Sequence, residues 1–100
     1  MLFMTIYTWE PARRNEIVKR RLETGLTISK ETKVIGEWTD LGGGRGFLLF
    51  ETGDPKAMIE ATMRWSDLME FETVPVIQTE EVMKLAKTPS PVLPGVEIKL

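Results

Sequence analysis

The sequence contains no cysteine and no histidine among its 100 residues. Without cysteine there is no disulfide framework, no thiolate nucleophile and no thiolate metal site. Without histidine, the usual proton shuttle near neutral pH and the commonest metal ligand in proteins are also missing. We therefore expect no metal site and no cofactor, and many familiar designs of enzyme active site are excluded.

A long apolar segment and an excess of positive charge are lacking as well. The longest apolar run, near the N-terminus, has no basic residues before it and meets Glu10 and Pro11 too early for a secretory signal or a membrane span. Thirteen basic and fifteen acidic side chains give a net charge of -2, which does not supply the attraction on which nucleic-acid affinity rests. We predict a cytoplasmic protein that binds neither membranes nor nucleic acid.

One short basic stretch, "KRR" from Lys19 to Arg21, stands against this charge balance. It falls near the end of a predicted helix, where basic residues complement the helix dipole. We interpret it as part of a solvated helix face.

What is present is the composition of an ordinary globular protein, 42% hydrophobic and 28% charged. The length suits one hydrophobic core, and we assign residues 1–87 to a single domain. Residues 88–100 are a proline-rich tail, whose last five residues, "VEIKL", alternate like one more strand.

The hydrophobic pattern predicts an α+β domain with the order β-α-β-β-α-β, which is the ferredoxin-like arrangement. In that fold the first and third strands are central, and Pro75 supports an edge position for the fourth because proline cannot donate to a ladder on both sides. A further short helix follows Thr79. Strands are predicted at residues 2–9, 33–41, 45–51 and 70–78, and helices at 12–25 and from Pro55 to about Trp65.

Three segments, "MLFMTIYTWEP", "GEWTDLGGGRGF" and "DPKAMIEATMRWSDL", resemble a small family of uncharacterised domains in the dimeric α/β-barrel superfamily. The resemblance covers roughly residues 1 to 85 and implies two sheets facing each other across a two-fold axis, with a cavity between them. Relatives in that superfamily include cofactor-independent monooxygenases and haem-degrading enzymes, which use histidine, asparagine and tryptophan in the cavity. Here histidine is absent and the only asparagine is Asn15, on a predicted helix.

The pattern of the first strand supports pairing of two chains independently. Two helices can cover only one face of a four-stranded sheet, and we place Phe3, Tyr7 and Trp9 on the uncovered face. Such a large exposed apolar patch is unusual on a monomer. We therefore predict a homodimer, in which the chain's partner is a second copy of itself.

The stretch "DLGGGRG", Asp40 to Gly46, holds four of the eight glycines. Phosphate-binding glycine loops join a strand to a helix, whereas these glycines join two predicted strands. We interpret the stretch as a hairpin connection in which glycine supplies positive φ angles. Arg45 is a candidate for binding an anionic group at the mouth of a ligand cavity, beside its simpler interpretation as a surface arginine.

Glu37 and Glu51 are the nearest approach to an acid/base pair, and the hairpin register decides whether they meet. A four-residue loop sets Glu37 opposite Phe50 and puts the glutamates on opposite faces, whereas a three-residue loop sets them directly across from each other. If they were paired and buried, one would have a raised pKa and could transfer protons. If they are not, each is solvated or salt-bridged separately.

Several aromatic residues lie on or beside the predicted sheet. Packing explains them adequately, but indole and phenol groups lining an apolar cavity also describe a ligand pocket. The candidate ligand-binding residues are Thr5, Tyr7, Trp9, Glu37, Trp38, Arg45 and Trp65, and the candidate catalytic residues are Glu37, Tyr7 and Glu51.

Three functions follow from this pattern. The first is a sensor or carrier that binds a small apolar or aromatic metabolite. The second is a cofactor-independent enzyme, monooxygenase-like or an isomerase, acting on a small apolar substrate. The third is a protein-interaction module with no ligand.

Overall fold

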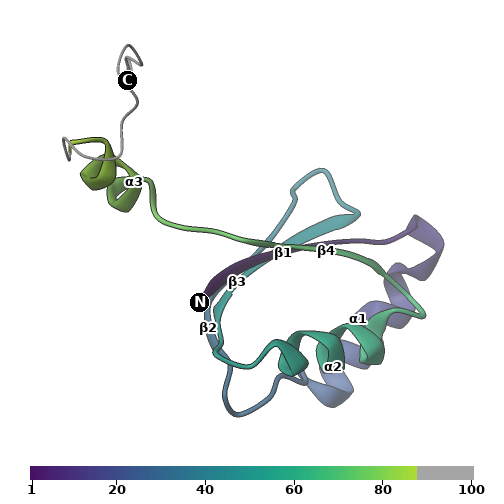
Figure 1. The fold of residues 1–100 in the computed structure, drawn as a ribbon. Coiled ribbons are helices and arrows are strands. Elements are labelled where there is room, and N and C mark those ends of the chain that lie inside the picture. Colours follow the sequence, from purple (N-terminus) through teal and green to yellow (C-terminus); the bar gives the residue numbers. More distant parts are fainter. Residues whose placement is uncertain (88–100) are drawn as a thin grey trace.

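The computed structural model describes residues 1–87 of the chain (Figure 1). The predicted tail of residues 88–100 and its strand lie outside the described residues. The elements are β1 (Leu2–Thr8), a 3-10 turn (Pro11–Arg13), α1 (Arg14–Thr24), β2 (Lys33–Thr39), β3 (Arg45–Glu51), α2 (Pro55–Trp65), β4 (Glu70–Pro75) and α3 (Thr79–Ala86).

The four strands form one antiparallel sheet in the order β2-β3-β1-β4, so the chain has the predicted ferredoxin-like α+β fold. The first and third strands are central, as predicted. Pro75 is the last residue of β4, which is an edge strand. A proline is tolerated there because the hydrogen-bond ladder does not need its N–H.

The connection between β2 and β3 is a hairpin, as the glycine-rich stretch predicted. Gly43 and Gly44 have φ angles of 84° and 77°, which other residues adopt only with strain. The Asp40 carboxylate accepts a hydrogen bond of 2.8 Å from the Gly42 amide and forms a 3.1 Å ion pair with Arg45. These local contacts fix the turn.

The helices α1 and α2 lie side by side on one face of the sheet (Figure 1). Arg20 of α1 ties them together, because its guanidinium donates two hydrogen bonds to the Asp67 carboxylate and one to the Arg64 carbonyl. It also stacks over the Trp65 ring, 5.4 Å from the centroid. The end of α2 is therefore anchored to α1.

The prediction that the aromatic set of β1 lies on the uncovered face is wrong. Phe3 stacks on Phe50, Tyr7 hydrogen-bonds Glu37, and all of these side chains lie on the face that the helices cover. The strand alternation itself was read correctly, but it does not say which set turns inward. The open face instead carries the aliphatic set of β1, which is Leu2, Met4 and Ile6.

The local sequence sets the start of α2 but not that of α1. The Asp54 side chain accepts a hydrogen bond of 3.0 Å from the Lys56 amide and so caps α2, with Pro55 in its first turn. Pro11 begins a 3-10 turn rather than the α-helix, which starts at Arg14. Leu22, near the end of α1, is 83% exposed.

The helix α3 forms where a short helix was predicted, but it projects away from the body of the molecule (Figure 1). It is preceded by an extended segment whose Val76 amide still donates to the Leu2 carbonyl. Its apolar side chains Val82 and Leu85 are 40% and 60% exposed. Within residues 1–87, no helix has the length and apolar character needed to cross a membrane.

Candidate functional site

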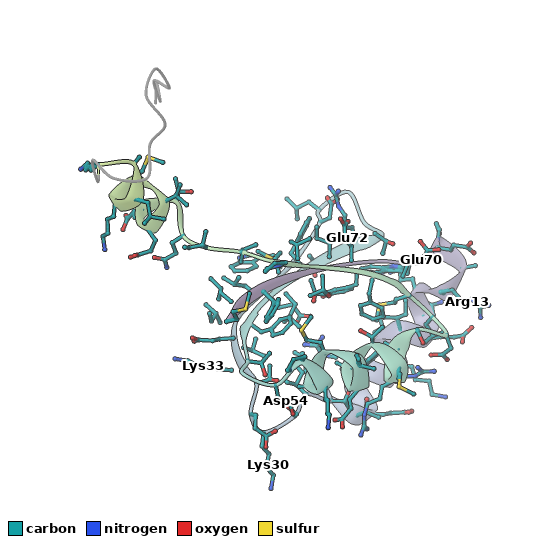
Figure 2. The ribbon with its side chains drawn as sticks, in the orientation of Figure 1. Arg13, Lys30, Lys33, Asp54, Glu70 and Glu72 are labelled. Atoms are coloured by element: carbon teal, nitrogen blue, oxygen red, sulfur yellow. The ribbon has the colours of Figure 1, made fainter. Side chains whose placement is uncertain are left out.

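A cavity of about 320 Å³ lies between the sheet and the two helices of a single subunit. This is the side of the sheet opposite to the one where the sequence predicted a ligand space. Figure 2 shows side chains from both layers entering the gap between sheet and helices. The lining consists of Arg14, Ile17, Val18 and Arg21 of α1, Ala57, Met58, Ala61, Thr62 and Trp65 of α2, and Thr5, Tyr7, Trp9, Leu26, Ile28, Thr32, Glu37, Thr39, Leu48, Phe50, Met69, Phe71 and Thr73 of the sheet and connections.

The helix periodicity explains which residues reach the cavity. Residues 14, 17, 18 and 21 of α1 follow the i, i+3, i+4, i+7 spacing of one helix face. On α2 the inward residues include Ala57 and Ala61, whose side chains are too short to fill the space beneath them. Small residues on α2 therefore keep a volume open that larger ones would close.

A polar cluster of three side chains stands on one wall of this mostly apolar cavity. The Tyr7 hydroxyl donates a hydrogen bond of 2.6 Å to Glu37, and the Arg21 guanidinium donates two, of 2.6 and 3.0 Å, to both carboxylate oxygens. The three residues come from β1, α1 and β2. The cluster thus fixes α1 to two strands of the sheet.

The electrostatics of the cluster follow from these contacts. The hydrogen bonds from Arg21 lower the pKa of Glu37 below its ordinary value of 4.5, against the opposing effect of burial. Burial and the hydrogen bond to Glu37 raise the pKa of Tyr7. At neutral pH the cluster therefore contains a carboxylate, a guanidinium and a neutral phenol.

Most other polar groups of the lining are also paired within the protein. The Thr5 and Thr73 hydroxyls share a hydrogen bond of 2.8 Å across β1 and β4. The Trp65 indole donates to the Thr27 hydroxyl at 3.0 Å, and the Thr62 hydroxyl donates to the Met58 carbonyl at 2.9 Å. The interior wall consequently offers an apolar surface with few unused hydrogen-bonding groups.

Gly46 is required for the position of Tyr7. The two residues are opposite each other in the β1–β3 ladder, and the Tyr7 ring lies over the glycine. A Cβ at position 46 would overlap the ring and the phenol oxygen. Glycine therefore allows Tyr7 to lie flat on the sheet, within reach of Glu37.

The sequence-predicted site residues separate into two groups. Thr5, Tyr7, Trp9, Glu37 and Trp65 are brought together in the lining of the cavity. Outside it lie Trp38, which is 53% exposed over Gly36 on the open face, Arg45, which is paired with Asp40, and Glu51.

The register of the hairpin keeps Glu37 and Glu51 apart. Glu37 lies opposite Leu48, and Glu51 lies opposite Lys33 on the other face, beyond an irregularity between Val34 and Gly36. Glu37 and Glu51 therefore lie on opposite faces of the sheet, as the four-residue loop predicted. Neither loop length, however, predicted Leu48 as the partner of Glu37. The turn begins one residue earlier than the prediction assumed, since the Asp40 amide donates to the Arg45 carbonyl, and this moves the partner of Glu37 from Phe50 to Leu48.

Sequence reasoning missed the two arginines of the cavity. The "KRR" stretch was assigned to a solvated face, yet Arg21 enters the cavity and binds Glu37. Helical spacing was the available signal. Arg14 lies three residues before Ile17, and Arg21 lies three residues after Val18, so each arginine shares a helix face with an apolar residue. Among residues 1–87, no group of three or more acidic side chains has a geometry suited to a metal ion.

Comparison with known proteins gives a family without a known activity. Searches of curated proteins and of solved structures found no significant match. A family model described as a domain of unknown function, DUF3303, matches residues 1–89, which is most of the chain. The chain belongs to the DUF3303 family of domains of unknown function.

Proposed function

We propose that this protein binds a small, largely apolar metabolite in the cavity between its sheet and its helices, as a sensor or carrier. The observation that carries the proposal is the cavity itself, about 320 Å³ in volume, which lies at the lower end of the range typical of ligand sites. An unfilled apolar space lowers the stability of the folded chain, and a bound ligand would offset this cost.

The alternative of a cofactor-independent enzyme finds less support in the contacts. A general base must be able to take up a proton near the working pH. Glu37 is instead held as a carboxylate by Arg21, and Tyr7 is held as a neutral phenol. The cluster is suited to fixing the cavity wall rather than to moving protons.

A homodimer of the dimeric α/β-barrel type is part of the proposal. The open face of the sheet has an apolar centre with charged residues at both ends of the strands: Glu70 and Glu72 on β4 at one end (Figure 2), and Lys33 of β2 opposite Glu51 of β3 at the other. A two-fold axis running along the strands would place β4 of one subunit over β2 of the other and bury the two apolar centres against each other. The apolar centre consists of Leu2, Met4, Ile6, Trp38, Phe47, Leu49 and Val74.

Filling the cavity from one wall tests the binding function. Ala61→Leu places a larger side chain in the cavity, and we expect it to weaken binding of the uncharged fluorescent probe N-phenylnaphthylamine by about tenfold. Ala12→Leu makes the same change at an exposed position outside the cavity and should leave the affinity unchanged.

Two results would contradict the binding function. One is the absence of probe binding to the unaltered protein. The other is an equal affinity in the unaltered protein and in the Ala61→Leu variant, with both chains folded by circular dichroism.

A further inference from the structure

We propose that the ligand of this cavity is a small amphipathic anion, with a carboxylate head bound by Arg14 and an apolar body inside. This inference rests on the proposed binding function and names the chemical class of its ligand. It arises from the charges of the lining rather than from its volume.

The described lining contains three charged side chains, Arg14, Arg21 and Glu37. Two positive charges and one negative charge leave a net charge of +1 at the cavity, although the whole chain carries -2. The excess positive charge is therefore local to this site. A complementary ligand carries one negative charge.

The two arginines differ in their availability. Arg21 already donates two hydrogen bonds to the Glu37 carboxylate, so its charge is neutralised within the protein. For Arg14, no hydrogen bond or ion pair of its side chain is found among residues 1–87. Because Arg14 is exposed and also lines the cavity, its guanidinium stands where the cavity meets solvent.

The position of Arg14 suits a head group rather than a buried ligand atom. Arg14 is the first residue of α1, and Ile17 and Val18, which also line the cavity, follow it on the same helix face. A ligand that runs along this face would keep its charge at the mouth and place its apolar part beside the aliphatic residues. A guanidinium binds a carboxylate through two parallel hydrogen bonds, so Arg14 should bind a carboxylate head group in preference to an uncharged one.

The test compares two ligands of equal chain length, decanoate and decanol, by calorimetry on the full chain. We expect decanoate to bind more tightly than decanol. Arg14→Gln should weaken the binding of decanoate by about tenfold and leave the affinity for decanol unchanged. The control is Arg13→Gln, which removes a neighbouring arginine that pairs with Glu16 at 3.4 Å outside the cavity (Figure 2).

The outcomes separate this inference from the binding function on which it rests. Equal affinities for decanoate and decanol, or an equal loss in the Arg13 and Arg14 variants, would overturn the role of Arg14 and leave the binding function standing. Failure of both compounds to bind would overturn both.

Discussion

At the scale of single residues, the cluster of Tyr7, Glu37 and Arg21 joins three elements through three hydrogen bonds. Each partner has a different task. Glu37 accepts all three bonds, Arg21 supplies the charge that keeps the carboxylate ionised, and Tyr7 covers Gly46. The cluster therefore couples the sheet register to the position of α1.

The pH dependence of folding should report the Glu37 carboxylate. Its folded pKa lies below the ordinary value of 4.5, so its stabilisation is present above that value and is lost as the pH falls through the folded pKa. Glu37→Gln should cost about 1–2 kcal/mol of unfolding free energy at neutral pH, because the pair is partly exposed.

Urea unfolding at a series of pH values measures this effect. The difference between the unaltered protein and Glu37→Gln should shrink as the solution becomes more acidic, because protonation removes the same ion pair. Asp40 and Asp67 also have lowered pKa values, but the unaltered protein and the Glu37→Gln variant both retain these residues, so their contributions cancel in the difference. A difference that stays constant down to about pH 3 would contradict the assignment.

The Gly46 position offers a test of the same cluster from the opposite strand. Gly46→Ala introduces a Cβ that overlaps the Tyr7 ring, so the ring must move and its bond to Glu37 must lengthen or break. We expect a loss of about 1–3 kcal/mol in unfolding free energy.

Combining Gly46→Ala with Tyr7→Ala, which removes the overlapping ring, should make the glycine substitution nearly neutral. This double-mutant cycle isolates the contact. Equal costs of Gly46→Ala in the presence and absence of the Tyr7 ring would refute it.

At the scale of elements, α2 is held by contacts at both ends, namely the Asp54 cap at its start and Arg20 against Asp67 and Trp65 at its end. Between them the inward residues Ala57 and Ala61 leave space toward the sheet. The ends keep the helix in place above the cavity.

Removing the cap should therefore lower stability without changing the fold. Asp54→Ala leaves the Lys56 amide without its side-chain acceptor, and we expect a loss of about 1 kcal/mol in urea unfolding. Asp54→Asn retains a capping oxygen and should cost less than Asp54→Ala. Equal losses in the two variants, which both lack the charge, would show that charge, and not the cap, stabilises this end.

The elements and their order could be read from the sequence because they depend on local signals. Alternation, the Asp54–Pro55 start, the glycine turn and Pro75 act within a few residues of themselves. Which face of β1 turns inward depends on packing against distant helices, and that was predicted wrongly.

The site was predictable only in part for the same reason. Tyr7, Trp9, Glu37 and Trp65 were predicted from residue type, and all four line the cavity, but the sequence placed that cavity on the other face of the sheet. Arg14 and Arg21 were missed because basic residues on a helix usually face solvent. Arg21 turns inward because it binds the Glu37 carboxylate of β2, a contact between distant segments that residue type alone does not predict.

At the scale of the whole molecule, the two faces of the sheet have separate uses in this account. The helix-covered face bounds the cavity within one subunit, and the open face is proposed to pair with a second copy. Ligand binding and dimerisation are therefore predicted to be separable by mutation.

A charge on the open face tests the pairing. Ile6 lies on this face, opposite Phe47 in the β1–β3 ladder, and Ile6→Glu should convert the dimer into a folded monomer in sedimentation experiments. Met63, on the outer side of α2, is 72% exposed, and Met63→Glu should leave the dimer intact. A folded monomer of the unaltered protein at micromolar concentration would refute the homodimer.

The central claim is that the ligand enters the space between sheet and helices, and the three tryptophans report on it directly. Trp9 and Trp65 line the cavity, whereas Trp38 lies on the open face. In a titration with decanoate followed by the indole N–H resonances in NMR, the account predicts that Trp9 and Trp65 shift while Trp38 does not. A shift of Trp38 with the other two unchanged would place the ligand on the opposite side of the sheet and contradict the account.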